Sequence, residues 1–185
     1  MPQLPTRIPG LVLLAPQVHG DHRGFFVETY RASDAALRGV EFVQDNHSRS
    51  RRGVVRGLHL QIGAGIGKLV RCGRGEIFDV AVDVRRGSPH YGRWEGYVLD
   101  DRAHRQLYVP AGFAHGFCVL SDVADVFYRQ TGYYDPDLER GIAYDDPEVA
   151  VEWPLPAAEL IASERDAGAP RLAEAAAELP FVFDG

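Results

Sequence analysis

Residues 44–61, QDNHSRSRRGVVRGLHLQ, place two amides, several guanidinium groups and a histidine within two predicted β-strands. Apolar alternation predicts these strands over residues 42–48 and 54–61, and the second contains Arg56-Gly57-Leu58-His59. Burying a cation and an imidazole in a strand is costly unless a ligand or partner replaces the lost hydration. The stretch therefore predicts a β-protein in which this strand contributes to a site for an anionic ligand.

The positions of Arg56 and His59 within the strand pose a geometric question. Strict alternation places the two side chains on opposite faces. Both reach one pocket if Gly57 interrupts the pleat with a bulge, or if Arg56 serves a neighbouring subunit. The sequence leaves both arrangements open.

Short alternating segments, separated by Gly, Pro, Asp and Asn, continue outward from this stretch along most of the chain. Strands are expected over residues 11–14, 25–30, 42–48, 54–61, 68–72, 76–84, 94–99, 106–109, 115–120 and 124–131. A short helix is expected at 33–38, with Ser33 as N-cap and Gly39 as its end, and LAEAAAEL predicts a terminal helix. Many short strands and little helix predict a mainly β sandwich or small barrel.

Period-two alternation also predicts which side chains share a face of each middle strand. The expected sets are Ala124, Val126 and Tyr128; His115, Phe117 and Val119; and Lys68, Val70 and Cys72. Each set combines apolar residues with one hydrophilic side chain. The middle strands are therefore expected to carry isolated polar groups into an apolar interior.

The composition is that of an ordinary globular protein, with 185 residues, 45% hydrophobic residues and a net charge of -6. This length suits one domain, and the acidic balance disfavours a general nucleic-acid binder. The charge is uneven, however. Residues 49–74 contain seven cations and no acid. We interpret this segment as a local anion site, with a solvated strand face as the alternative.

Cysteine usage and hydropathy indicate the compartment. Cys72 and Cys118 each lie in an apolar run, which is typical of buried thiols in a reducing environment. The N-terminal LVLLAP run is too short for a secretory signal, and no apolar stretch reaches the roughly 20 residues of a membrane helix. We expect a cytoplasmic protein that does not associate with membranes.

Several motifs together resemble one family. The segment Pro110-x-Gly112-x-x-His115 is similar to the second motif of cupin barrels. Together with DHRGFFVETY, QDNHSRSRRGVVRGLH, KLVRCGRGEIFDVAVDVRRGSPHYGRWEG, YVPAGFAHGF and YYDPDLERGIAYDDP, it resembles the dTDP-4-dehydrorhamnose 3,5-epimerase family from about residue 21 to residue 166. The motifs follow the order of the family with nearly its spacing.

The resemblance implies a cupin-type jelly-roll β-barrel with short C-terminal helices, formed by one domain over residues 1–185. Residues from about 155 to 185 are then a helical segment that closes the barrel. The resemblance also implies a homodimer and a reaction without a metal or other cofactor. The expected substrate is a dTDP-linked 4-keto-6-deoxy sugar, whose C3 and C5 are inverted through an enolate.

Such a reaction needs a base, a cation beside the developing enolate, and an acid on the opposite face of the sugar. By resemblance, His59 is the base, Asp166 in SERDAGAP orients it, and Lys68 stabilises the enolate. Tyr128 is the candidate acid, and Tyr134 is the competing choice. The spacer LQIGAGIG between His59 and Lys68 departs from the longer Pro- and Gln-containing loop of the family, which bears on how Lys68 reaches the site.

The remaining candidate residues are substrate contacts implied by the resemblance. Arg23 and Arg56 match the contacts to the diphosphate, since guanidinium groups bind phosphate oxygens in pairs. Phe26 and Tyr134 are expected to sandwich the thymine ring. The other candidate contacts, to nucleotide, sugar or diphosphate, are Glu28, Gln44, Asn46, His115 and Glu139.

Three alternatives remain open. Within the family, a single-centre epimerase that inverts C3 or C5 alone uses the same core residues. A metal cupin is disfavoured because Leu58-His59-Leu60-Gln61 has glutamine where a His-x-His pair would place its second imidazole. A non-catalytic sugar-nucleotide binding module is the third alternative, and the combination of His59, Lys68, Tyr128 and Asp166 disfavours it.

Overall fold

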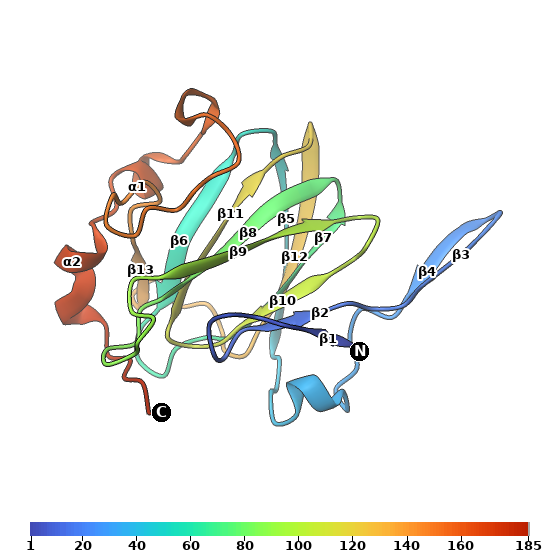
Figure 1. Ribbon diagram of the computed structural model, residues 1–185, viewed down its shortest axis with the longest axis horizontal. Helices are drawn as coiled ribbons and strands as arrows, with labels where there is room; N and C mark the ends of the chain where they lie inside the picture. The colour runs from blue at the N-terminus through green and yellow to red at the C-terminus, as the bar shows by residue number, and fades with distance from the viewer. Residues whose placement is uncertain (185) are drawn as a thin grey trace.

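Two antiparallel sheets face each other in the computed structural model, which describes residues 1–184 (Figure 1). The six-stranded sheet has the order β1 (Gln3–Leu4), β2 (Val12–Leu14), β10 (Gln106–Val109), β7 (Lys68–Arg74), β12 (Val123–Gln130) and β5 (Gln44–Arg51). The five-stranded sheet has the order β13 (Glu139–Gly141), β6 (Val55–Gln61), β11 (Phe113–Val119), β8 (Glu76–Asp83) and β9 (Trp94–Asp100). The mainly β prediction is confirmed, as a sandwich whose sheets stay open at their edges.

The main hydrophobic core lies between the sheets. Alternate residues of β7 and β12, among them Val70, Cys72, Ala124 and Val126, pack there against Phe117 and other side chains of the opposite sheet. The period-two pattern therefore assigned the inward faces of these strands correctly. Because the same faces carry Tyr128 and Lys68, these polar side chains are also directed between the sheets.

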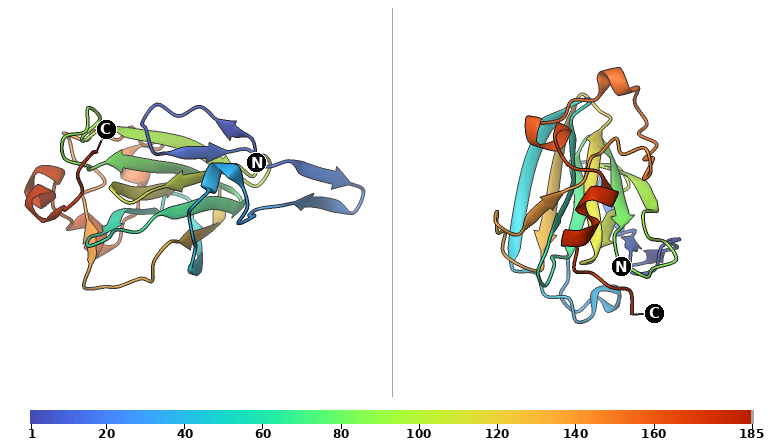
Figure 2. Two further views of the ribbon diagram at one scale, coloured as in Figure 1. Left: turned by 90° about the horizontal axis from the view of Figure 1, so that it is seen from below. Right: turned by 90° about the vertical axis from the view of Figure 1, so that its left-hand side faces the viewer.

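Short helices and irregular segments cover the outer faces of the sandwich. The 3₁₀ helix η1 (Ala35–Leu37) begins after Asp34, whose carboxylate accepts from the Ala36 amide, so the prediction of Ser33 as N-cap is wrong. The C-terminal segment contains η2 (Ala157–Glu159), α1 (Glu164–Ala167), α2 (Leu172–Ala175) and η3 (Ala176–Glu178). It covers the outer face of the five-stranded sheet (Figure 2). The predicted terminal helix is thus shorter than LAEAAAEL.

Three strands escaped prediction because they are short and polar or glycine-containing: β1, β13 and β3 (Val18–Asp21). Strand β3 pairs with β4 (Gly24–Val27) in a separate two-stranded hairpin that projects from the sandwich (Figures 1 and 2). At its tip the chain turns between Asp21 and Gly24. The hairpin therefore has little of the chain around it.

A bulge in β6 settles the question of Arg56 and His59. His59 pairs with His115 and Arg56 pairs with Phe117, so Gly57 and Leu58 lie opposite the single residue Gly116. Gly57 has φ +134°, and a Cβ there would lie 2.5 Å from the Cα of Gly116, so only glycine fits. The bulge brings Arg56 and His59 to the same cavity within one chain.

Among residues 1–184, the structure contains no helix long and apolar enough to cross a membrane.

Candidate active site

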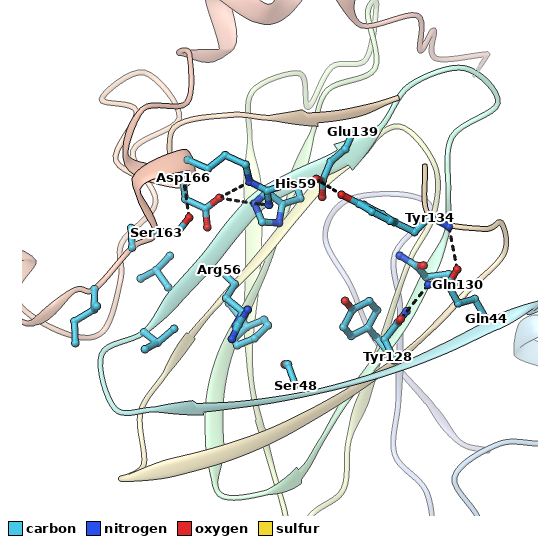
Figure 3. A pocket seen from close by; sticks show the side chains of 17 residues that line it. Gln44, Ser48, Arg56, His59, Tyr128, Gln130, Tyr134, Glu139, Ser163 and Asp166 are labelled. Atoms are coloured by element: carbon cyan, nitrogen blue, oxygen red, sulfur yellow. Dashed lines mark hydrogen bonds and ion pairs between the residues drawn. The ribbon is translucent and has the colours of Figure 1, made fainter. Parts of the chain in front are cut away.

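A cavity of about 820 Å³ opens between the sheets near α1 (Figure 3). Inward-facing side chains of β5 and β12 form one wall, and those of β6 form another. Tyr134, Glu139 and the segment 161–166 complete its rim. Both sheets and the C-terminal segment thus contribute to one cavity.

His59 and Asp166 form a hydrogen-bonded pair in this cavity. The ring Nε2 of His59 lies 2.7 Å from Asp166 Oδ1, and the two side chains are 19% and 5% exposed. Asp166 lies in α1, where the hydroxyl of the N-cap Ser163 accepts from its backbone amide at 3.1 Å. A carboxylate only accepts, so Nε2 carries the proton and Nδ1 stays free to act as a base.

Burial of this pair favours a neutral imidazole. Burial lowers the pKa of His59, and the nearby Asp166 carboxylate only partly opposes this shift. Burial raises the pKa of Asp166, but its bonds to His59 and the Gly57 amide outweigh this, so the net shift is downward. The arrangement is an uncharged base held by an ionised carboxylate.

Lys68 approaches the pair from the opposite sheet. Its Nζ donates to the carbonyl oxygen of His59 at 3.3 Å. Burial lowers the pKa of Lys68 to about 8, while Glu139 and Asp79 oppose the shift. The shorter spacer before Lys68 therefore still lets the ammonium group reach the neighbourhood of His59.

Tyr128 and Tyr134 occupy different parts of the cavity. Tyr128 lies across from His59, on β12, and burial raises the pKa of its phenol (Figure 3). Tyr134 lies at the rim, where its hydroxyl donates to Glu139 Oε2 at 3.0 Å. Of the two phenols, Tyr128 has the position from which a proton can be delivered opposite to His59.

Arg165 belongs to the site although the sequence did not single it out. Its guanidinium pairs with Glu139 and lies 3.1 Å from His59 Nε2. The only sequence signal is its position directly before Asp166. A cation at this point is suited to an anionic group of a ligand in the cavity.

A row of polar side chains continues along the inner faces of β5 and β12. Gln44, Asn46 and Ser48 alternate along β5, and Gln130 faces Gln44 from β12. Arg56 also lines the cavity, and its Nε donates to Ser50 Oγ at 3.1 Å. Ser48 and Gln130 were not among the expected site residues. Each lies two positions after an expected residue, Asn46 or Tyr128, so period-two alternation places its side chain on the same inner face of the strand.

Four expected contacts lie outside this cavity. Arg23 and Phe26 are on the projecting hairpin, where Arg23 pairs with Asp21 and Phe26 is 70% exposed. Glu28 pairs with Arg31 near the N-terminus. His115 was expected to contact the ligand, but it is buried and does not line the cavity. Its Nε2 lies 2.9 Å from Asp79 Oδ1. The structure thus does not bring Phe26 and Tyr134 together within one chain, and their contacts with a ligand stay predictions.

Among residues 1–184, no group of three or more His, Cys, Asp and Glu side chains is arranged to hold a metal ion. The metal-free reaction stays a prediction.

Comparisons with known proteins point to one family. The family model described as dTDP-4-dehydrorhamnose 3,5-epimerase matches residues 5–174. A dTDP-4-dehydrorhamnose 3,5-epimerase of Pseudomonas aeruginosa is 53% identical over 162 residues, covering 86% of this chain and 89% of that protein. A dTDP-4-dehydrorhamnose 3-epimerase of Streptomyces niveus is 45% identical over 175 residues, covering 92% and 84%.

A solved structure extends the similarity to the whole fold. The dTDP-6-deoxy-D-glucose-3,5-epimerase of Legionella pneumophila, in complex with dTDP-4-keto-L-rhamnose, matches with a TM-score of 0.95 and 44% identity. The match covers 100% of this chain and 99% of that one.

Proposed function

The chain belongs to the dTDP-4-dehydrorhamnose 3,5-epimerase family, and on that premise we propose that it inverts C3 and C5 of a dTDP-4-keto-6-deoxyhexose through an enolate. It is an isomerase that acts on a sugar nucleotide, and its fold is the cupin-type jelly roll expected for that family. The observation that carries the mechanism is the pair formed by His59 and Asp166 at the cavity between the sheets.

The proposed reaction begins with His59. Nδ1 takes the proton from the carbon next to the ketone. The C–H electron pair becomes a C=C bond to the carbonyl carbon, and the π pair of the carbonyl moves to oxygen to give the enolate. Asp166 fixes the tautomer with Nδ1 unprotonated and stabilises the imidazolium that forms. A lowered pKa keeps His59 unprotonated, and hence ready to act, at neutral pH.

Lys68 and Tyr128 complete the proposed reaction. The ammonium group of Lys68 stabilises the negative charge on the enolate oxygen, which interacts more strongly in a buried site than in water. Tyr128 donates a proton to the carbon from the side opposite to His59 and regains one from solvent, to which the imidazolium of His59 releases the proton that it took. The configuration of the carbon inverts because one proton leaves from one face of the sugar ring and the other arrives at the opposite face.

Deuterium incorporation tests this function. We expect dTDP-4-keto-6-deoxyglucose, incubated with the enzyme in deuterated water and followed by NMR, to gain deuterium at both C3 and C5. Incorporation at C3 alone would establish the single-centre reaction that the name of the Streptomyces niveus relative describes. A substrate that keeps its protons at both carbons would contradict the proposal.

The same experiment on Tyr128→Phe tests the acid. If Tyr128 delivers the second proton, the variant should lose more of its rate of inversion than of its rate of deuterium exchange at the first carbon. The reason is that His59 still removes a proton and returns deuterium to the same face. Equal loss of both processes would assign Tyr128 a different role.

We also propose a homodimer in which the hairpin β3–β4 of one chain completes the cavity of its partner. The hairpin exposes Phe25 and Phe26, at 59% and 70%, together with Arg23. Exposed aromatic side chains beside a cation are typical of a contact surface. Strand β5 is the edge of the six-stranded sheet and carries cavity residues, so a hairpin laid along it would bring Arg23 and Phe26 to the partner's site.

Mixing two defective variants tests this arrangement. We expect Arg23→Ala to raise KM about 10- to 100-fold, the effect of losing a charge-assisted hydrogen bond. A mixed dimer of Arg23→Ala and His59→Ala then contains one site with both residues intact, so refolding the two variants together restores activity. Light scattering that finds a monomer, or a mixture with no more activity than its parts, would refute the shared site.

A cytoplasmic location stays a prediction from the sequence.

A further inference from the structure

Gln130 is a cavity residue with an unpaired polar atom. It ends β12, is only 6% exposed, and lines the cavity beside Tyr128. Among the described residues, no hydrogen-bond donor reaches its buried amide oxygen. Because buried polar atoms in folded proteins are nearly always paired, this side-chain amide points to a polar group of the ligand.

A second unpaired group nearby is a donor, and its identity is fixed by a chain of hydrogen bonds. The backbone amide of Tyr134 can only donate, and it donates to Gln44 Oε1 at 2.9 Å. Gln44 Nε2 must then face Asn46 Oδ1, at 3.0 Å. The remaining atom of this amide, Asn46 Nδ2, is therefore a buried donor without a partner.

The two unpaired groups lie close together beside an aromatic ring. In the register of β5 and β12, Gln130 is opposite Gln44 and Tyr128 is opposite Asn46, so Asn46 and Gln130 are diagonal neighbours on the same face. The bond from Tyr134 to Gln44 holds the tyrosine next to them (Figure 3). This corner of the cavity therefore offers the donor of Asn46, the unpaired amide of Gln130 and a flat apolar surface.

We propose that Gln130 recognises the imide edge of the thymine ring. Its Oε1 accepts a hydrogen bond from thymine N3–H, Asn46 Nδ2 donates to the adjacent thymine carbonyl, and Tyr134 packs against the ring. Thymine presents a donor directly beside an acceptor on this edge, which matches the two unpaired groups. The inference rests on the proposed function, which makes a thymidine diphosphate the ligand.

Calorimetric titration of the whole protein with dTDP and with its N3-methyl derivative tests the contact. The methyl group removes the N3–H donor, so wild-type protein should bind the derivative at least about tenfold more weakly than dTDP. Gln130→Met should bind dTDP about tenfold more weakly than wild type does and should barely distinguish the two ligands. Arg129→Met, on the outward-facing neighbour in β12, is the matched control and should behave as wild type.

The outcomes separate this inference from the function itself. If N3-methylation weakens binding by the same factor in wild type and Gln130→Met, the amide does not contact N3 and the inference is wrong. If wild-type protein binds no dTDP, the proposed function fails instead. Should Gln130→Met prove unstable, Gln130→Asn, which withdraws the same amide by one methylene, provides the same comparison.

Discussion

Replacement of His59 by alanine is expected to lower turnover by about 10²- to 10⁴-fold, the contribution typical of a general base. The structure gives the reason, since His59 is the imidazole of the cavity that an ionised carboxylate orients, through a 2.7 Å contact with Asp166. Binding of dTDP should change little, because the proposed contacts to base and diphosphate come from other side chains. Steady-state rates and calorimetric titration of the variant measure the two quantities separately.

His47→Ala is the matched control for this substitution. His47 lies on the outer side of β5, where it stacks on Phe127 and contacts Asp125 instead of the cavity. The control should keep nearly full activity. Substantial turnover in His59→Ala, with exchange at C3 or C5 intact, would remove His59 as the base.

Replacement of Lys68 by methionine is expected to lower kcat by about 10²- to 10³-fold, as loss of an oxyanion-stabilising group does. The pH dependence of the wild-type activity should reflect the titration of both His59 and Lys68. Activity falls on the acid side as His59, whose pKa is lowered, becomes protonated, and on the alkaline side as Lys68 loses its proton near pH 8. Lys68→Arg should move the alkaline limit upward, since a guanidinium stays charged.

The sequence offers a direct measurement of this titration. Lys68 is the only lysine of the chain, so protein made with isotopically labelled lysine gives a single side-chain NMR signal. We expect this signal to titrate near pH 8 in wild-type protein. A midpoint at the ordinary value for lysine would show that the ammonium is solvated and would contradict its proposed role beside the enolate.

The prediction of strands succeeded where at least one face of the strand packs in the main core. Strand β10 (Gln106–Val109) and the inward sets on β7 and β12 follow from alternation alone, because one face of each strand packs in the main core. Strands β1, β3 and β13 have two to four residues and few core contacts, so their pairing depends on neighbours that are distant in the sequence. Alternation contains no information about such pairing.

The site was predictable in part for similar reasons. The family motifs identified His59 and Asp166, and the structure brings them together although 107 residues separate them. Arg165 and Gln130 gave no signal of their own, because a cation in a polar segment and an amide at a strand end are common on protein surfaces. Their directions depend on α1 and on the register of β12 against β5.

The imidazole of His59 and the phenol of Tyr128 lie on different sheets, so the packing between the sheets affects their separation. His59 belongs to the five-stranded sheet and Tyr128 to the six-stranded sheet, so the proposed base and the proposed acid lie on opposite sheets. The distance between the two sheets is set by the side chains packed between them, such as Val126. In the proposed reaction, the separation of base and acid therefore depends on the thickness of the core, and a volume change at Val126, which does not line the cavity, would alter how well Tyr128 delivers its proton to the face opposite His59.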